Sequence, residues 1–176
     1  QEFKKKSVII PNGIDPYWLK NRNKSKKILP EKKIKIVYAG RISKRKNVVT
    51  SAKVCDYLIK KGYKIEFNVI GKVENKIEFN KLCKYNFVNY FPAQPKEKLI
   101  HYYRDNDIFM MPSITETFGL VYAEAMSQGL PIIYSRGQGF DGQTKEGLVG
   151  YSVDCFNIVE IRSEEHTSEL QSQDGI

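Results

Sequence analysis

The stretch IKIVYAG at residues 34–40 is followed by NVVTSAKVCDYLIKK at residues 47–61, so that a strand pattern directly precedes a helix pattern. The first segment is rich in β-branched residues and ends in glycine, which is typical of a buried strand. In the second, apolar residues recur at i, i+4, i+7 and i+11 from Val48, which predicts a helix with one buried face. Gly62 follows where a C-terminal cap is expected.

The same alternation continues to residue 153. Further strands are predicted at residues 63–71, 87–91, 107–111, 131–134 and 150–153, and further helices at residues 76–85, 95–103 and 118–128. Short strands that alternate with helices need crossover connections, which make neighbouring strands parallel. The sequence therefore predicts an α/β fold built on a doubly wound parallel (Rossmann-like) sheet.

The composition is that of a soluble globular domain. The 176 residues are 41% hydrophobic and 28% charged, and 29 Lys and Arg against 20 Asp and Glu give a net charge of +9. No run approaches the roughly 18 apolar residues of a membrane helix. Three cysteines without metal-ligand spacing favour a reduced, cytoplasmic protein. The basic balance indicates an anionic partner, which could be nucleic acid, an acidic membrane or a phosphorylated ligand.

The N-terminal segment differs from the region that follows it. VIIPNGID at residues 8–15 resembles a strand that runs into an Asn-Gly turn, and residues 21–27 are polar and basic, as in a connector. We expect residues 1–33 to be the end of an interdomain linker and an entry segment, with a preceding domain missing. The domain itself is expected over residues 34–161 and is expected to be truncated at its C-terminus.

The C-terminal segment, residues 162–176, has four acids, one base and no periodic apolar face. A flexible acidic tail is one interpretation. Residues 162–172 also resemble the in-frame translation of a sequencing adapter, so we expect the segment to be non-native. Without it the chain keeps 28 bases and 16 acids, a net charge of +12.

Ligands of open α/β sheets lie beyond the carboxyl ends of the strands, so the strand-to-helix junctions are the candidate sites. The first junction is GRISKRKN at residues 40–47. Gly40 allows close backbone approach, and Arg41 and Lys46 add positive charge beside a helix N-terminus. This combination indicates a phosphate site, with a solvated basic loop as the alternative. Neither a GxGxxG nor a P-loop pattern follows.

The second junction is PSITETFGLVYAEAM at residues 112–126. Glu116 falls in the loop, and residues 118–120 begin the predicted helix with their N–H groups directed beyond the sheet. Glu124 lies about one turn inside, and its side chain tilts back toward the same cleft. A carboxylate accepts two hydrogen bonds, which suits a vicinal diol such as that of ribose. The alternatives are a helix cap for Glu116 and a solvated position for Glu124.

Together, NGID at residues 12–15, Gly40-Arg41 with Lys46, and ETFGLVYAEAM at residues 116–126 resemble the C-terminal half of a group 1 (family 4) glycosyltransferase of the GT-B fold. Glu116 and Glu124 match the E-x7-E motif of that family. The similarity covers about residues 7–160.

Two positions depart from the family pattern. Asn47 and Ala93 stand where glycine is frequent, and both substitutions look tolerable. A glycine-rich loop at residues 135–143 resembles that of a subset of these enzymes, and we assign it no role beyond lining the cleft.

The resemblance implies a nucleotide-diphosphate sugar as donor, retention of anomeric configuration, and no metal or other cofactor. Glu116 would contact the transferred sugar, while Arg41 and Lys46 would hold the diphosphate, and these three are the expected catalytic residues. The remaining expected donor-binding residues are Gly40, Phe91, Ala93, Phe118, Gly119, Leu120 and Glu124. Among them, the turn at residues 91–93 would lie beside the base, residues 118–120 would donate to the distal phosphate and sugar, and Glu124 would bind the ribose.

The expected acceptor is a glycan or lipid-linked molecule in polysaccharide or cell-envelope biosynthesis. It would be bound by the missing N-terminal domain, so the isolated chain is expected to be inactive. Peripheral association with the acidic inner face of the plasma membrane is a further hypothesis. Alternatives are a sugar-phosphate synthase or epimerase of GT-B type, or a basic nucleic-acid-binding module. Nucleic acid is not the expected partner, because the tyrosines are scattered rather than interleaved with bases.

Overall fold

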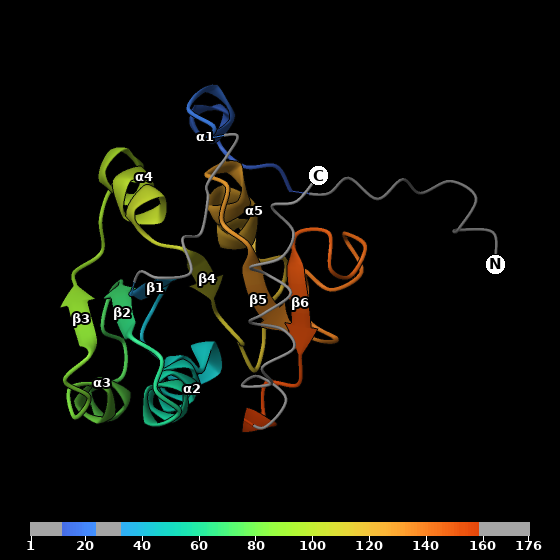
Figure 1. The fold of residues 1–176 in the computed structure, drawn as a ribbon. Coiled ribbons are helices and arrows are strands. Elements are labelled where there is room, and N and C mark those ends of the chain that lie inside the picture. Colours follow the sequence, from blue (N-terminus) through green and yellow to red (C-terminus); the bar gives the residue numbers. More distant parts are fainter. Residues whose placement is uncertain (1–11, 24–32, 159–176) are drawn as a thin grey trace.

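The computed structural model describes residues 12–23 and 33–158, which form one sheet with helices on both faces (Figure 1). The six strands are β1 (Ile34–Ala39), β2 (Ile65–Ile70), β3 (Val88–Phe91), β4 (Ile108–Met110), β5 (Ile132–Ser135) and β6 (Gly150–Val153). They lie in the order β3-β2-β1-β4-β5-β6, and every neighbouring pair is parallel. The predicted doubly wound parallel sheet is confirmed, with each strand within two residues of its predicted ends.

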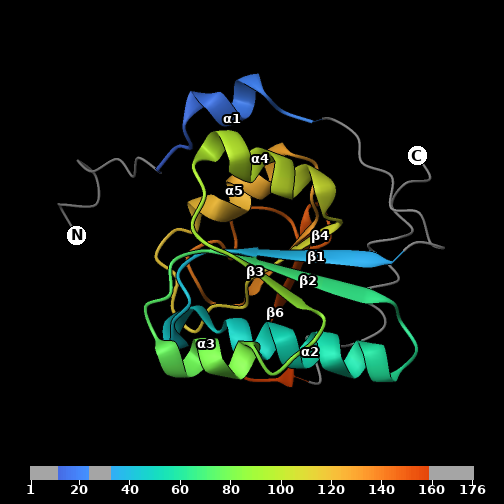
Figure 2. The same cartoon turned by 90° about the vertical axis from the view of Figure 1, so that its left-hand side faces the viewer.

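The helices make two layers. They are α1 (Pro16–Lys20), the 3₁₀ turn η2 (Lys44–Lys46), α2 (Val48–Lys60), α3 (Lys76–Leu82), α4 (Lys96–Asp105) and α5 (Leu120–Ser127). Helices α2 and α3 cover one face of the sheet, and α4, α5 and α1 lie on the other (Figure 2). Both faces of the central strands are therefore buried, which explains their continuous apolar runs.

The carboxyl ends of the central strands lie close together. β1 and β2 pair in register along their whole length, from Ile34 opposite Ile65 to Ala39 opposite Ile70. The loops that leave these two strands therefore start at the same level of the sheet. β3 continues this alignment, because Phe91 pairs with Ile70.

The N-terminal segment contains a helix that the sequence analysis did not predict. Residues 12–15 are not a strand, and α1 begins at Pro16; the part of the predicted strand before residue 12 lies outside the described residues. The carboxylate of Asp15 caps α1 by accepting from the N–H of Tyr17 at 2.8 Å. Trp18 is buried, with its ring centroid 5.6 Å from that of Tyr103 in α4. The entry segment is thus packed onto the α4–α5 layer.

Helix α5 starts two residues later than predicted. Gly119 has a φ of 76° and stands at the N-cap, so the helical conformation begins only at Leu120. Phe118 and Gly119 consequently belong to the loop after β4.

The expected connector is irregular over residues 21–23, and its remainder and the tail at residues 162–176 lie outside the described residues. The division into linker, domain and tail stays a prediction.

Candidate functional site

The strand order reverses between β1 and β4, and the loops that leave these two strands lie against each other. β1 leads through residues 40–47 into α2, and β4 leads through residues 111–119 into α5, on the opposite face of the sheet. The N–H of Ile114 donates to the carbonyl of Arg45 at 2.8 Å and ties the loops together. Such a switch point is where open α/β sheets bind their ligands.

Lys46 and Glu116, which were predicted from separate loops, form an ion pair. Nζ of Lys46 donates to Oε2 of Glu116, and the two side chains are only 15% and 9% exposed. Oε1 of Glu116 accepts from the N–H of Thr117 at 3.1 Å. Because the pair is largely shielded from water, its attraction is stronger than that of an exposed pair. An anionic ligand that reached Lys46 would compete with Glu116 for the ammonium group.

Asn47 fixes the turn that carries Lys46. Its φ of 55° is left-handed, a conformation that asparagine tolerates better than most residues with a side chain. Its Nδ2 donates to the carbonyls of Pro112 and Cys155, both at 2.9 Å. Asparagine therefore suits this position, where the family often has glycine, and adds two hydrogen bonds that glycine lacks.

Arg41 is paired with a different carboxylate, that of Glu74. Its Nη1 is 2.9 Å from Oε1 of Glu74, and 64% of its side chain is exposed. Its carbonyl accepts from the hydroxyl of Tyr38 at 2.8 Å. Burial raises the pKa of Tyr38 well above its usual value, so this hydroxyl remains a donor at neutral pH. The guanidinium predicted to hold a diphosphate thus has a carboxylate partner that the sequence analysis did not consider.

A cavity of about 310 Å³ opens at the carboxyl ends of β1 and β2. Three expected donor-binding residues, Gly40, Arg41 and Ala93, line it. The other lining residues, which sequence reasoning missed, are Ala39, Ile70, Gly71, Lys72, Gln94, Leu99 and Val121. Small and aliphatic side chains dominate this set, and such a lining suits a flat, weakly polar group such as a nucleobase.

The backbone at this end of the sheet is packed too closely for side chains. A Cβ atom on Gly71 would lie 1.7 Å from the carbonyl oxygen of Gly40, so the two strand ends can meet only because residue 71 is glycine.

Phe91, which was expected beside a base, lies in β3 and does not line the cavity. Its ring packs against that of Tyr102, with centroids 4.9 Å apart.

The start of α5 borders the same cavity. Gly119 is the N-cap and Leu120 the first helical residue, and no side chain caps the first turn within the described part of the chain. Val121, in that turn, lines the cavity. Uncapped N–H groups at a helix start attract anions. Residues 118–120 do not line the cavity themselves, so the N–H contacts expected of them stay a prediction.

Glu124 is half-buried in α5, near the N-terminal segment. Burial, and to a lesser extent the negative charge of Asp15, raises the pKa of its carboxyl group. Asp15 itself is paired with Lys96, and this hydrogen bond lowers the pKa of the Asp15 carboxyl group. The entry segment thus places a second carboxylate close enough to influence Glu124.

The glycine-rich loop holds Glu116 in place, a role that the sequence analysis did not assign. Oε1 of Gln138 accepts from the N–H of Glu116 at 3.0 Å, and the N–H of Gly139 donates to the carbonyl of Glu116 at 2.9 Å. A Cβ atom on Gly139 would lie 2.0 Å from the carbonyl oxygen of Thr117. Phe140 anchors the loop, because its ring packs 5.1 Å from that of Tyr122. The available signal was the run of glycines directly after a predicted strand.

Two kinds of feature are absent from the described ranges, residues 12–23 and 33–158. No three His, Cys, Asp or Glu side chains there are placed to hold a metal ion. Nor does any helix in those ranges combine the length and apolar character needed to cross a membrane.

The fold and the site together define a Rossmann-like domain with the Lys46–Glu116 pair at the switch point and a cavity at the carboxyl ends of β1 and β2. The family model described as "Glycosyl transferases group 1" matches residues 20–163, so the chain belongs to this glycosyltransferase family. The resemblance drawn from the motifs is thereby confirmed.

Known proteins agree with this assignment. An uncharacterized 41.2 kDa protein in the cps region of Klebsiella pneumoniae is 35% identical over 140 residues, which are 74% of this chain and 36% of that protein. A D-inositol 3-phosphate glycosyltransferase of Paenarthrobacter aurescens is 26% identical over 160 residues, 83% of this chain and 39% of that protein. The chain thus spans less than half the length of these relatives.

Solved structures of the GT-B class share the fold. The C-terminal domain of a group 1 family glycosyl transferase (LpcC) from Francisella tularensis superimposes with a TM-score of 0.67 at 21% identity, covering 78% of each chain. WaaG, a glycosyltransferase of lipopolysaccharide biosynthesis, gives a TM-score of 0.68 at 18% identity over 94% of this chain and 49% of its own. The predicted C-terminal half of a GT-B fold is confirmed.

Proposed function

We propose that this chain is the donor-binding half of a retaining glycosyltransferase that uses a nucleotide-diphosphate sugar. The observation that carries the proposal is the meeting of Lys46 and Glu116 at the switch point, beside the start of α5. Such a donor is anionic at its diphosphate and rich in hydroxyl groups at its sugar. The ammonium group can bind the diphosphate, and the carboxylate can accept hydrogen bonds from the sugar hydroxyls.

The surrounding groups suggest how the donor would lie. The base would enter the cavity between Gly40 and Ala93, and Glu124 would accept hydrogen bonds from the ribose hydroxyls. The diphosphate would then reach Lys46 and the uncapped start of α5. Lys46 would exchange its bond to Glu116 for one to phosphate, which would leave the Glu116 carboxylate available to the sugar. Arg41 could join only after leaving Glu74.

In the proposed reaction the bond between the anomeric carbon and the distal phosphate oxygen breaks, and the acceptor hydroxyl forms the new bond on the same face while its proton passes to the departing diphosphate. Negative charge grows on the departing diphosphate, where Lys46 and the α5 N–H groups would stabilise it. The Glu116 carboxylate is paired with a lysine rather than with a second acid, which argues against a two-carboxylate glycosidase site. No metal is required in this scheme.

The names of related proteins support the class of acceptor. One relative lies in a cps region, and structural neighbours include enzymes of lipopolysaccharide biosynthesis. A neighbour from E. coli has been solved with UDP-2-fluoro glucose. We therefore propose a glycan or lipid-linked acceptor in cell-envelope or polysaccharide synthesis, bound by parts of the enzyme other than the described residues, and a UDP or GDP sugar as donor.

Isothermal titration of the chain with UDP and GDP tests the proposal. We expect binding of one of them, and a loss of about tenfold or more in affinity for Lys46→Ala because a charge-assisted contact is removed. Lys44→Ala is the matched control, since Lys44 is an exposed lysine of the same η2 turn. Its affinity should stay within about twofold. If neither nucleotide binds, or if both variants lose affinity equally, the assignment of Lys46 is wrong.

A further inference from the structure

Positive charge is concentrated on the layer formed by α2, α3 and their flanking turns, residues 48–64 and 72–86, which we call the lysine face. It carries eight exposed lysines: Lys53, Lys60, Lys61, Lys64, Lys72, Lys76, Lys81 and Lys84. Its acids are Asp56, Glu74 and Glu78. The opposite layer, residues 12–23, 92–106 and 118–130, has five bases against four acids. The two flat sides of the molecule therefore differ strongly in charge.

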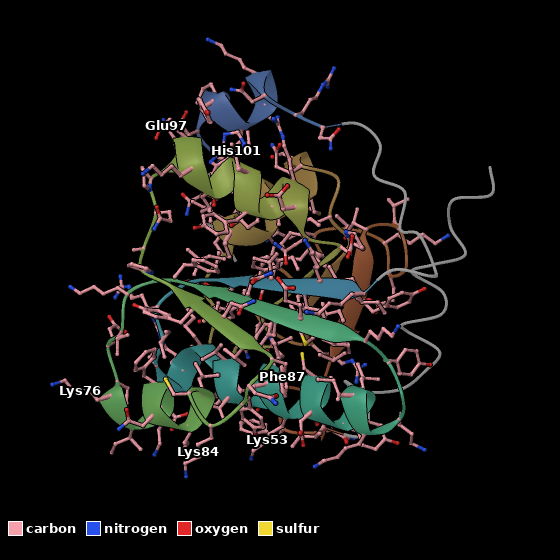
Figure 3. All side chains as sticks on the ribbon, turned by 60° about the vertical axis from the view of Figure 1, so that its left-hand side comes forward. Lys53, Lys76, Lys84, Phe87, Glu97 and His101 are labelled. Atoms are coloured by element: carbon pink, nitrogen blue, oxygen red, sulfur yellow. The ribbon has the colours of Figure 1, made fainter. Side chains whose placement is uncertain are left out.

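The acids of the lysine face are already engaged. Asp56 is paired with Lys60 at 2.6 Å, Glu78 with Lys81 at 2.7 Å, and Glu74 with Arg41 of the site at 2.9 Å. Within the described part of the chain, this leaves Lys53, Lys61, Lys64, Lys72, Lys76 and Lys84 without a carboxylate partner. Figure 3 shows three of these, Lys53, Lys76 and Lys84, directed away from the sheet, on the side opposite Glu97 and His101 of α4.

The bases of this face are all lysines. The five arginines of the described ranges, at positions 22, 41, 45, 104 and 136, lie outside it. Arginine is the residue suited to bidentate recognition of a defined phosphate or base, whereas lysine acts as a point charge. A surface of lysines alone matches a partner whose negative charge is spread out, such as a layer of lipid headgroups.

An apolar side chain projects from the same face. Ile77, next to Lys76 in the first turn of α3, is 68% exposed. A bilayer interface accepts such a side chain among lysines, because the apolar group enters the headgroup region while the charges remain at its surface. Single-stranded nucleic acid instead needs a series of stacking aromatics, and Tyr63, 37% exposed, is the one large aromatic side chain exposed on the described face.

We propose that the lysine face binds the surface of an anionic lipid bilayer. The helices of the face cover a flat side of the sheet (Figure 2), and the face meets the candidate cleft only at Lys72, because the cavity lies at the carboxyl ends of the strands. A bilayer docked on α2 and α3 therefore leaves the cavity open. The proposal does not depend on the chain's binding a nucleotide. Its failure would leave the proposed donor site unaffected, and the reverse also holds.

Co-sedimentation of the chain with lipid vesicles tests the proposal. Vesicles of neutral phosphatidylcholine are compared with vesicles in which about a third of the lipid is phosphatidylglycerol. The test variant replaces Lys53, Lys76 and Lys84 with Gln. The matched control replaces Lys20, Lys98 and Lys145 with Gln, which removes the same charge from exposed lysines elsewhere. Circular dichroism checks that both variants are folded.

We expect binding to the anionic vesicles only, and its loss in about 1 M salt, where the Debye length is about 3 Å. Each lysine near an anionic surface contributes about a fivefold gain in partition, so the test variant should lose about a hundredfold. The control should lose less than about tenfold. Ile77→Ser, which keeps every charge, should weaken binding several-fold at low salt.

Three results would overturn the proposal. The first is equal loss in the test and control variants, which would mean that net charge alone drives binding. The second is equal binding to neutral vesicles. The third is tighter binding to an oligonucleotide than to the anionic vesicles, which would identify nucleic acid as the partner.

Discussion

Glu116 is fixed by its backbone as well as by its side chain. The side-chain oxygen of Gln138 accepts from the Glu116 N–H, and the N–H of Gly139 donates to the Glu116 carbonyl. Lys46 binds the Glu116 carboxylate. If Lys46 turns to a bound diphosphate, the backbone contacts are what remains to hold Glu116 toward the sugar. The glycine-rich loop then acts as a support for a donor-binding residue, and its effect should be visible on the sugar rather than on the nucleotide.

Gln138→Ala should separate the two parts of the donor. Removing the side-chain acceptor leaves the Glu116 N–H unpaired and costs about 1 kcal/mol, which loosens the loop. We expect the affinity for the nucleoside diphosphate to stay within about twofold, while the gain in affinity from the attached sugar falls about fivefold. Titration calorimetry with the nucleoside diphosphate and with the nucleotide sugar measures this difference. Gln143→Ala removes a bond to Gly139 of the same loop and is the control; an equal effect there would contradict the role of Gln138.

The ionised Glu124 carboxylate should lower the stability of the fold and strengthen nucleotide binding. Burial raises its pKa above the usual value, so the folded state binds this proton more tightly than the unfolded state. The group therefore stabilises the fold below its ordinary pKa, and this contribution is lost as the pH rises through the raised value. At pH 7 the half-buried carboxylate has no cation paired with it among the described residues, and Glu124→Gln should raise the melting temperature.

The same substitution should weaken nucleotide binding by about tenfold if the carboxylate accepts the ribose hydroxyls, because hydrogen bonds to a charged group are lost. Thermal unfolding at pH 5 and pH 7 and titration with the nucleoside diphosphate check both statements. The stabilisation by Glu124→Gln should be larger at pH 7 than at pH 5. A variant that is destabilised at pH 7, or that binds normally, would refute this account of Glu124.

At the scale of elements, Trp18 is the buried residue of helix α1. Trp18 is the only tryptophan of the sequence and is 2% exposed, whereas Leu19 beside it is 59% exposed. Burial of the Trp18 ring on Tyr103 and the pairing of Asp15 with Lys96 attach a helix of five residues, which would not form alone. The segment also carries Asp15, so its docking determines the charge near Glu124.

Trp18→Ala should lower the free energy of unfolding by about 3 kcal/mol or more, since it empties a buried aromatic site. Leu19→Ala on the exposed side should change it by less than about 0.5 kcal/mol. Urea unfolding followed by circular dichroism measures both. In the native chain the Trp18 fluorescence should be blue-shifted and poorly quenched by acrylamide. Ready quenching would mean that α1 is not docked in solution.

The elements also show which features sequence can predict. Strands that are buried on both faces appear in the sequence as short, continuous apolar runs. All six strands of the sheet were predicted within two residues of their ends. Helix α1 was missed because PYWLK is too short for a period to register, although Asp15 before Pro16 is a start signal. The Lys46–Glu116 pair joins residues 70 positions apart, and Arg41 finds Glu74 33 positions away. Such pairings depend on how the loops pack, which no local pattern specifies.

At the scale of the whole molecule, the described residues supply the candidate donor groups, and we propose that the acceptor is bound elsewhere in the enzyme. The candidate donor-binding groups come from the loops after β1 and β4, the start of α5 and the glycine-rich loop. All of them serve the donor in the proposed scheme, and the matched stretch covers 36% of the Klebsiella relative and 39% of the Paenarthrobacter relative. Binding of the donor and its turnover should therefore be separable in this chain.

We expect the chain to bind its nucleotide sugar and to release no nucleoside diphosphate from it. Glycosyl transfer needs an acceptor oxygen placed close to the anomeric carbon, and this positioning accounts for much of the rate that enzymes achieve. Chromatography of the nucleotide after long incubation, with and without simple glycans, measures release, and titration calorimetry on the same sample confirms binding. Lys46→Ala, which should bind poorly, is the control for background hydrolysis. Release above that background would show that the described residues suffice for cleavage of the donor, and the assignment of acceptor positioning to the rest of the enzyme would then be wrong.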